Sequence, residues 1–404
     1  MPVLRNIGQL ASCPPSDDQS DIGLIANAAL VWRGNRIVWL GPESDLPEEY
    51  QAEEAENCRG RLIVPGLIDC HTHLCFGGWR EQEFEQRIQG KSYLEIAEAG
   101  GGIINTVRAT RDADSAELSR KAAATLDDML ALGITTVEAK SGYGLDFDNE
   151  IKQLEIYARL NRTHDIDLVA TLLGAHVIPP EYRDNRREYI SLLTERLIPA
   201  VADRELAEFC DCYIDAGAFT LEEGREILEC AKQCGLGLKI HAEQIQHTGA
   251  AGLAADLGAV SAEHLEHIDD RGIQAMAGAG TVAVTLPLAS LYLREAFTDA
   301  GRLIKAGIPV AVATDFNPGS APSYHLPFAM TLACLNQQMT PAETLKGVTS
   351  YAARAIGRQH LMGSLLPGYQ ADISVIDAPS VNHWLYQLQG NACHKVIKAG
   401  QQIN

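Results

Sequence analysis

Short apolar runs recur through the middle of the chain, and each of them ends in polar residues or glycine. The stretches between them have the spacing of amphipathic helices, as in residues 115–133, where Gly133 is placed to end the helix. Strands that alternate with helices are typical of a parallel βα fold, and eight is the strand count of a (β/α)8 barrel. The eight predicted strands are residues 62–69, 134–142, 166–176, 209–217, 236–243, 259–264, 281–287 and 308–315.

The two ends of the chain have a different pattern. Near the N-terminus, "ALVWRGNRIVWLG" is two β-rich runs around Gly34 and Asn35, which predicts a hairpin. Near the C-terminus, "GSLLPGYQADISVID" and "HKVIKAGQQI" are again short strands separated by Pro and Gly. We therefore expect an α/β protein with a TIM-like (β/α)8 catalytic barrel in residues 61–355. Residues 1–60 and 356–404 would together form a small composite β-sandwich subdomain.

The charge composition limits the kinds of molecule that the protein is expected to bind. The 404 residues carry 33 Lys and Arg against 53 Asp and Glu, a formal charge of −20, which disfavours nucleic acid and anionic membranes. A small anionic substrate would need a local cationic clamp. There is no apolar run that would span a bilayer and no signal-peptide pattern, so we expect a cytoplasmic protein whose 10 cysteines stay reduced.

Four of those cysteines could be drawn as a zinc site, since Cys210 and Cys212 lie in "FCDCYID" and Cys230 and Cys234 in "CAKQC". Neither pair has the two-residue gap of common zinc sites. We interpret them as buried structural thiols.

The chemistry is concentrated where the predicted strands end. "DCHTHLCFGG" places His71 and His73 after the first strand, and His241, His264 and Asp315 close later strands. The carboxyl ends of barrel strands form the active-site mouth, and residues two apart on a strand share a face, so His71 and His73 would both point inward with Thr72 turned away.

A single histidine is more often a hydrogen-bonded polar residue than a metal ligand, but joint placement at several strand ends favours a metal site. His71, His73, His241 and Asp315 form a plausible shell for one divalent metal ion, Zn2+ or Fe2+, or for Fe3+, with a position left for an activated water. For the additional histidine we prefer His264, which closes a strand, over His267, which fits a solvated turn.

Longer motifs extend this picture. "VPGLIDCHTHL", "HAEQ" and "VAVATDFNPGS" resemble the metal signatures of the amidohydrolase superfamily, and "GSLLPGYQADISVID" resembles the strands that close its β-subdomain. Within that superfamily, "GWREQEFEQRIQGKSYLEIAEAGGGI", "EAKSGYGL" and "LLGAHVIPPEY" resemble the imidazolonepropionase family.

The resemblance implies a mononuclear metal hydrolase that cleaves a cyclic amide C–N bond, opening 4-imidazolone-5-propanoate to N-formimidoyl-L-glutamate in histidine degradation. It also implies a homodimer, although the sequence carries no interface signal. Lys140 lies on the second strand, the wrong place for the carboxylated lysine that bridges two metals in binuclear relatives. The residues that would bind the metal are His71, His73, His241 and Asp315, and those that would contact substrate or product are Arg80, Tyr143, His176, Gln244, Asn317, Gly319 and Ser320.

Arg80 would clamp the substrate carboxylate, because a guanidinium pairs with a carboxylate in a bidentate manner. The alternative for Arg80 is an ion pair with Glu81, Glu83 or Glu85, and for Tyr143 it is an ordinary surface turn. Tyr143 and His176 would help Arg80, and Gln244 would lie near the ring.

The proton transfers have several candidates. Asp315 would accept the proton of the attacking water and return it to the leaving nitrogen, and the metal or His264 would stabilise the oxyanion. Glu243 shares a strand face with His241 if the strand continues, whereas Gln244 matches the motif better; alternation leaves both open as the residue facing the ring. If Gln244 is the contact, it cannot act as a base.

Two rival functions follow from the same residues. A cytosine or guanine deaminase would use the same metal shell on an uncharged base, which would leave Arg80 without an anionic partner. A noncatalytic protein with a structural zinc is a rival of another class, but structural sites are usually closed and rich in cysteine.

Overall fold

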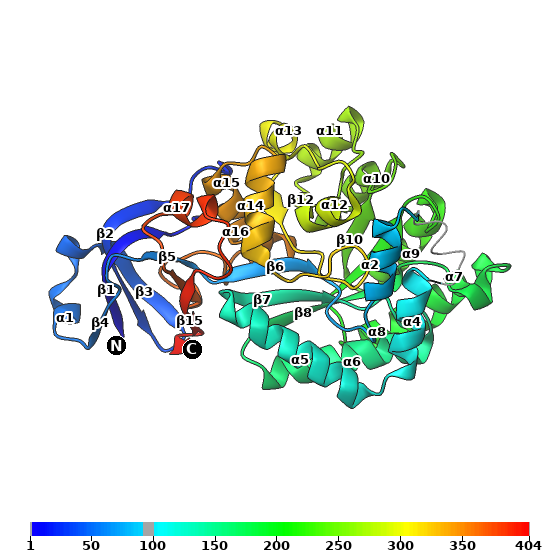
Figure 1. Cartoon of the computed structure of the whole chain (residues 1–404), viewed down its shortest axis with the longest axis horizontal. Helices are drawn as coiled ribbons and strands as arrows, with labels where there is room; N and C mark the ends of the chain where they lie inside the picture. Colours follow the sequence, from blue (N-terminus) through cyan, green and yellow to red (C-terminus); the bar gives the residue numbers. More distant parts are fainter. Residues whose placement is uncertain (1, 92–100, 404) are drawn as a thin grey trace.

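The computed structural model describes residues 2–91 and 101–403, and these residues form two eight-stranded sheets. Figure 1 shows the sheet built from the two chain ends on one side and the helix-covered barrel on the other, with both termini near each other. The family-like block that begins at Gly78 falls partly on residues 92–100, which lie outside the described residues.

The second sheet is the predicted barrel. Its neighbouring strands pair in parallel, in chain order, and a bridge between Thr72 and Phe316 joins the first strand to the segment after the last. Seven of the eight predicted strands occur at their expected places, and the eighth, residues 62–69, contributes its end to β6, which confirms the barrel. The barrel strands are β6 (Leu67–Thr72), β7 (Ile134–Lys140), β8 (Asp167–Ala175), β9 (Phe209–Ile214), β10 (Gly237–Ala242), β11 (Ser261–His264), β12 (Val282–Thr285) and β13 (Val310–Val312).

Helices surround these strands, and local sequence explains their ends. The side chain of Asp114 accepts a hydrogen bond from the backbone N–H of Glu117 at the start of α5, and Gly133 follows its end with φ +94°. The barrel-side helices are α2 (Glu81–Ile88), α4 (Ile103–Asp112), α5 (Ser115–Ala131), α6 (Phe147–Thr163), α7 (Arg186–Leu192), α8 (Ile198–Asp203), α9 (Leu221–Gln233), α10 (Ala250–Leu257), α11 (Asp270–Ala279), α12 (Pro287–Leu293), α13 (Ala300–Lys305), α14 (Leu326–Asn336), α15 (Pro341–Gly347), α16 (Ser350–Ala355) and α17 (Val381–Tyr386).

The first sheet joins the two arms of the chain. Strand β5 pairs with β1 from the N-terminal arm on one side and with β14 from the C-terminal arm on the other, so the two arms belong to one sheet and are joined through β5. The predicted hairpin at Gly34 and Asn35 connects β2 and β3. The strands are β1 (Val3–Ala11), β2 (Leu24–Arg33), β3 (Arg36–Pro42), β4 (Ala55–Asn57), β5 (Leu62–Pro65), β14 (Ile373–Ile376), β15 (Cys393–Lys398) and β16 (Gln401–Gln402); the short helix α1 (Glu48–Gln51) lies beside them.

The predicted strand 62–69 is in fact two strands, and Gly66 is the reason. The chain leaves the terminal sheet after β5 and enters the barrel at β6, with only Gly66 between them. A Cβ at Gly66 would lie 2.3 Å from Thr135 Oγ1, so only glycine fits this close passage. The connection from β5 in the terminal sheet to β6 in the barrel is therefore a single residue.

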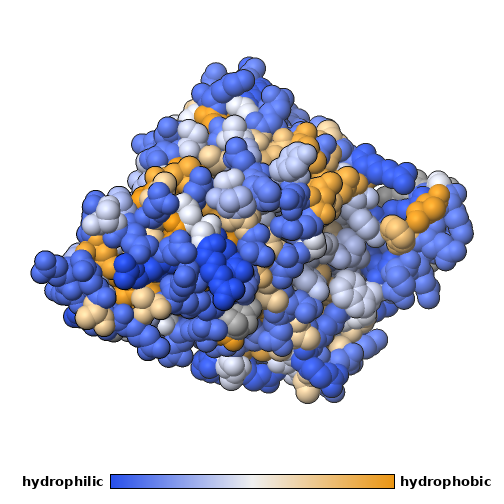
Figure 2. Space-filling view, turned by 60° about the vertical axis from the view of Figure 1, so that its left-hand side comes forward, coloured by the Kyte–Doolittle hydropathy of each residue, from blue (hydrophilic) through white to orange (hydrophobic). Residues whose placement is uncertain are grey.

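The surface is that of a charged protein. On the face in Figure 2, hydrophilic residues predominate and hydrophobic ones gather in separate groups. Across residues 2–91 and 101–403, no helix combines the length and apolar character needed to cross a membrane. Cys210 and Cys212 are buried free thiols on β9, and Cys230 and Cys234 are half-buried free thiols on α9 and at its end.

Candidate metal centre

The centre begins at the carboxyl end of β6. His71 and His73 both point into the barrel mouth, with their ring centroids 5.4 Å apart, and both are buried. Thr72 between them turns away, and its hydroxyl donates to the carbonyl oxygen of Glu138 on β7 at 2.7 Å. The alternation of side chains along a strand therefore produces the inward pair that the sequence indicates.

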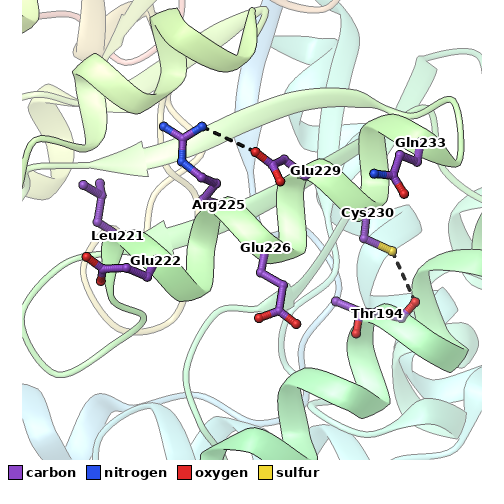
Figure 3. A pocket seen from close by; sticks show the side chains of 8 residues that line it. All are labelled: Thr194, Leu221, Glu222, Arg225, Glu226, Glu229, Cys230 and Gln233. Carbon is purple, nitrogen blue, oxygen red and sulfur yellow. Dashed lines mark hydrogen bonds and ion pairs between the residues drawn. The ribbon is translucent and has the colours of Figure 1, made fainter.

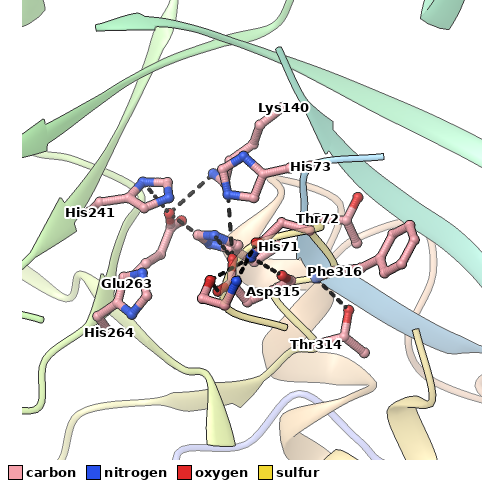
Figure 4. A network of polar contacts seen from close by, with 12 residues as sticks. His71, Thr72, His73, Lys140, His241, Glu263, His264, Thr314, Asp315 and Phe316 are labelled. Atoms are coloured by element: carbon pink, nitrogen blue, oxygen red, sulfur yellow. Dashed lines mark hydrogen bonds and ion pairs between the residues drawn. The ribbon is translucent and has the colours of Figure 1, made fainter. Parts of the chain in front are cut away.

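His241 and Asp315 come from distant parts of the chain and meet this pair (Figure 4). The ring centroid of His241 lies 4.6 Å from that of His71 and 5.5 Å from that of His73. Asp315 Oδ1 lies 3.3 Å from Nε2 of His71 and 3.4 Å from Nε2 of His73. The two histidines hold the pKa of the Asp315 carboxyl well below its usual range, although burial alone would raise it.

These residues fit a divalent metal ion. Nε2 of His71 and Nε2 of His241 are buried without a hydrogen bond, a costly state unless a ligand takes their lone pairs. The donor atoms of His71, His73 and Asp315 lie within 4.8 Å of one another, as do those of His71, His241 and His264. Neutral imidazole nitrogens beside a carboxylate are donors that zinc and iron accept. The structure thus brings together all four predicted ligands.

His264 completes the group at the end of β11. Its ring centroid lies 5.4 Å from that of His241, and its Nδ1 lies 3.8 Å from a carboxylate oxygen of Glu266. Burial lowers the pKa of His264, but the neighbouring carboxylates of Glu266 and Asp315 together outweigh it, and the net shift is upward. His267 is exposed, as the sequence predicts.

Five charged residues lie buried beneath the imidazoles, and the sequence reasoning missed their role. We call them the buried charge layer: Glu138, Lys140, Asp211, Lys239 and Glu263. Lys140 Nζ lies 2.8 Å from Glu138, 2.7 Å from Asp211 and 3.1 Å from Glu263. Lys239 Nζ lies 2.9 Å from Glu263. The two lysines hold the pKa of Glu263 well below its usual range in spite of burial.

The layer contacts the ligands from below. Glu263 Oε2 lies 3.0 Å from Nδ1 of His71, and Asp211 Oδ2 lies 2.9 Å from Nδ1 of His241. Carboxylates in this position keep the proton on Nδ1, so that Nε2 faces the centre with a free lone pair. Alternation was a usable signal here, because Lys239 precedes His241 by two residues and therefore shares its face.

A cavity of about 730 Å3 opens above the centre. It is lined by the ligands His73, His241 and Asp315 and by His264. All seven residues predicted to contact substrate also line it: Arg80, Tyr143, His176, Gln244, Asn317, Gly319 and Ser320.

Arg80 is buried at the start of α2 and is already paired. Its Nε and Nη2 lie 2.8 and 2.7 Å from Oε2 of Glu83, and both side chains are 6% exposed. Of the three acids that the sequence offers as partners, the structure selects Glu83. Arg80 nevertheless lines the cavity. Its Nη1 packs against Gly319, and a Cβ added to Gly319 would lie 2.2 Å from that nitrogen.

Tyr143 and His176 also lie on the cavity wall. Tyr143 is buried, not a surface turn residue, and Glu150 holds its turn by accepting hydrogen bonds from the backbone N–H groups of Gly142 and Gly144. His176 stacks on His73 at 5.2 Å, and its Nδ1 lies 3.0 Å from the carbonyl oxygen of Gly142. Burial and the neighbouring histidines hold the pKa of His176 well below its usual value, so the ring is neutral at pH 7.

The structure separates Glu243 from Gln244. Strand β10 ends at Ala242, and Glu243 adopts φ +58°, which breaks the alternation that would have placed it beside His241. Its carboxylate accepts a hydrogen bond from the backbone N–H of Gly249 at 2.8 Å, and it is not among the residues that line the cavity. Gln244 lines the cavity, and its Oε1 accepts a hydrogen bond from the hydroxyl of Tyr213 at 2.9 Å.

The segment after β13 fixes the second oxygen of Asp315. Ser320 Oγ donates to Asp315 Oδ2 at 3.2 Å, and Asn317 Nδ2 donates to Ser320 Oγ at 2.7 Å. Asp315 itself has φ +55°, a strained value that this short loop maintains. The carboxylate is thus held at both oxygens, one beside the imidazoles and one beside a hydroxyl.

A separate hollow of about 510 Å3 lies beside α9, and Figure 3 shows the side chains that line it. Arg225 in it pairs with Glu229 at 3.4 Å, and Cys230 Sγ donates to the carbonyl oxygen of Thr194 at 3.2 Å. The hollow contains none of the predicted site residues, so we place no chemistry there.

Comparison with known proteins agrees with this geometry. Residues 62–403 match the Amidohydrolase family. The chain is 45% identical to an imidazolonepropionase of Geobacillus kaustophilus over 98% of this chain and 94% of that protein. It is 44% identical to an imidazolonepropionase of Fusobacterium nucleatum over 99% of this chain and 98% of that protein.

Solved structures support the fold. A 5-methylcytosine deaminase from Klebsiella pneumoniae superposes with a TM-score of 0.76 at 15% identity, covering 100% of this chain and 97% of that one. An adenosine deaminase from Xanthomonas campestris with bound zinc gives a TM-score of 0.73 at 17% identity, covering 99% and 92%. These two likenesses concern architecture alone, whereas the sequence identity extends over nearly the whole length: the chain belongs to the amidohydrolase family and, within it, to the imidazolonepropionases.

Proposed function

We propose that this chain hydrolyses the ring of 4-imidazolone-5-propanoate and releases N-formimidoyl-L-glutamate. The observation that carries the proposal is a cluster of imidazoles and one carboxylate that opens into a cavity whose wall bears arginine. The cluster suits hydrolysis of an amide C–N bond, and the arginine suits a substrate with a carboxylate tail. The near full-length identity to imidazolonepropionases supports this choice of substrate.

The metal would be held by His71, His73, His241 and Asp315. A divalent ion bound there acidifies a water molecule, so that hydrolysis proceeds near neutral pH. Nitrogen and oxygen donors suit Zn2+ and iron alike, and elemental analysis of the purified protein distinguishes the two ions.

Asp315 is the residue best placed to move protons. Its Oδ2, held by Ser320, takes the proton of the attacking water as oxygen adds to the ring carbonyl carbon. The same carboxylate then returns that proton to the ring nitrogen as the C–N bond breaks. His264, whose pKa is raised by Glu266, donates a hydrogen bond to the oxyanion.

The remaining side chains orient the ring. Because Nδ1 of His176 faces the carbonyl oxygen of Gly142, this neutral ring presents Nε2 as an acceptor, which suits a ring N–H better than a carboxylate. Gln244, whose Oε1 already accepts from Tyr213, offers its amide hydrogens to the ring. Arg80 binds the carboxylate, and Glu243 takes no part in the reaction.

Turnover of 4-imidazolone-5-propanoate, followed by absorbance beside a panel of nucleobases, tests the proposal against a deaminase. We expect loss of the imidazolone signal and no change in cytosine or guanine. Asp315→Ala should abolish turnover, and Arg80→Ala should raise KM much more for the propanoate than for a substrate lacking the carboxylate. Deamination of a nucleobase, or near-wild-type rates in Asp315→Ala, would contradict it.

Metal removal tests the remaining rival, a noncatalytic protein with a structural zinc. Three of the four predicted ligands, His73, His241 and Asp315, line an open cavity, and none of the four is a cysteine, so a chelator should abolish turnover while the melting transition remains cooperative. Unfolding on metal removal would favour the structural role.

A further inference from the structure

Two arginines of α2 meet at one glycine of the cavity wall. Arg80 precedes the helix and Arg87 lies in its last turn, about two helical turns further on, so both face the same side. Arg87 Nη2 donates to the carbonyl oxygen of Gly319 at 2.9 Å, and Arg80 Nη1 packs against the Cα side of the same residue. Both arginines line the 730 Å3 cavity.

Their charges are not equally available. The guanidinium of Arg80 is neutralised by Glu83, whose other carboxylate oxygen accepts the backbone N–H of Gly102 at 2.9 Å. A carboxylate that approaches Arg80 therefore also meets the negative charge of Glu83. Arg80 alone is an incomplete binding site for an anion.

Arg87 lacks such a partner. Among the described residues, no Asp or Glu oxygen lies within ion-pair distance of it, and its Nη1 is buried without a hydrogen bond. Its guanidinium carbon lies 5.0 Å above the ring of Tyr292, which fixes the plane of the group. A buried N–H donor without an acceptor is costly, and a ligand oxygen would relieve that cost.

We propose that Arg87 is a second substrate-binding residue, whose Nη1 donates to the carboxylate of the substrate beside Arg80. This inference rests on the proposed function, because it assumes an anionic substrate in this cavity. Gly319 lies between the two guanidinium groups and sets their separation. The ligand class selected is a five-membered nitrogen ring with a short carboxylate chain, and Arg87 supplies the positive charge that Glu83 does not cancel.

The test uses Arg87→Gln and Arg87→Lys in the metal-loaded enzyme. For each we measure KM and kcat with 4-imidazolone-5-propanoate, and inhibition constants for 3-(imidazol-4-yl)propanoate and its uncharged amide. Losing a hydrogen bond to a charged group should raise KM and the inhibition constant of the propanoate roughly 10- to 100-fold. The inhibition constant of the amide should stay unchanged. For the propanoate, the inhibition constant of Arg87→Lys should lie between those of wild type and Arg87→Gln, because lysine keeps the charge but cannot donate two parallel hydrogen bonds.

Arg108→Gln is the matched control, because Arg108 is exposed on α4 and does not line the cavity. It removes the same charge and should behave as wild type. The inference would be overturned if a folded Arg87→Gln had the wild-type inhibition constant for the propanoate, or if its affinities for the propanoate and for the amide fell equally. If Arg87→Gln does not fold, wild-type inhibition constants in Arg87→Lys overturn the inference. Because inhibitor binding needs no turnover, a wild-type enzyme that binds the propanoate better than the amide but leaves 4-imidazolone-5-propanoate intact would contradict only the proposed function.

Discussion

Replacing Glu263 with Gln tests whether the buried charge layer holds the metal site. Glu263 is fully buried and contacts Nδ1 of His71 at 3.0 Å, Lys140 at 3.1 Å and Lys239 at 2.9 Å. Glutamine has nearly the same volume, so packing is preserved while one negative charge is removed. The effect therefore reports electrostatics and the orientation of His71.

The structure allows the size of the effect to be worked out. The layer has two lysines against three carboxylates, so it carries one net negative charge, and Asp315 adds a second close to the imidazoles. Glu263→Gln makes the layer neutral and halves this charge. Changing such a supporting carboxylate lowers metal affinity about 10- to 100-fold, or about 1.4–2.7 kcal/mol. Breaking a buried ion pair also destabilises folding by about 3–5 kcal/mol.

Competition with a chromophoric chelator measures metal affinity, and urea unfolding measures stability. Asp372→Asn is the matched control: Asp372 is a buried carboxylate paired with Lys398 at 2.7 Å, but it lies on the terminal sheet, at the start of β14. We expect both variants to lose stability and only Glu263→Gln to lose metal affinity. Wild-type metal affinity in a folded Glu263→Gln would refute the reasoning.

Two further predictions concern the cavity wall and its support. Gly319→Ala should fold, because the nearest atoms to its Cβ would all belong to side chains, Arg80 Nη1 at 2.2 Å and Asn317 Oδ1 at 3.3 Å, but it should displace the Arg80 guanidinium and raise KM about tenfold or more; an unchanged KM, with melting unchanged, would contradict the contact. Lys121 packs 3.6 Å from the ring centroid of Phe76 and donates to the carbonyl oxygen of Gly78, and burial lowers its pKa to about 8. The unfolded value is about 10.4, so the folded state releases its proton first, and the free energy of unfolding should rise with pH between about 8 and 10.4. Lys121→Met should remove that part of the slope in urea titrations, and a parallel slope in both proteins would contradict the assignment.

Sequence patterns sufficed for the barrel because its strands are buried on both faces and end in recognisable residues. Each predicted apolar run contributes a strand, and the predicted metal ligands lie where those runs end. The run 62–69 was the exception, since it reads as one strand while Gly66 divides it between two sheets. Hydrophobicity does not record which sheet a strand joins; that depends on the close passage of Gly66 over Thr135.

Three features of the site depend on geometry that patterns do not carry. Helix spacing left Glu81, Glu83 and Glu85 as partners for Arg80, and only the direction of the side chains selects Glu83. To decide whether Glu243 or Gln244 faces the cavity, one must know that β10 ends at Ala242, because alternation stops there. Inward-facing charges such as Lys239 and Glu263 are rare in barrel interiors, because isolated buried charges are costly. A sequence pattern predicts such a charge only if it also identifies the oppositely charged partners, and these come from other strands.

Different structural elements carry the residues proposed to bind the metal and the residues proposed to bind the substrate carboxylate. Metal binding would depend on the residues at the strand ends and on the buried charge layer, in which Glu263 and Asp211 contact the imidazoles. In the proposed function, recognition of the substrate carboxylate would depend on the arginines at the two ends of α2 and on Gly319, which both of them contact. Because the two sets come from different elements, changes in α2 should alter KM and leave metal affinity intact, while changes in the layer should do the reverse. A variant of Arg87 that lost metal would show that the two tasks are coupled, and the division argued from the contacts would then be wrong.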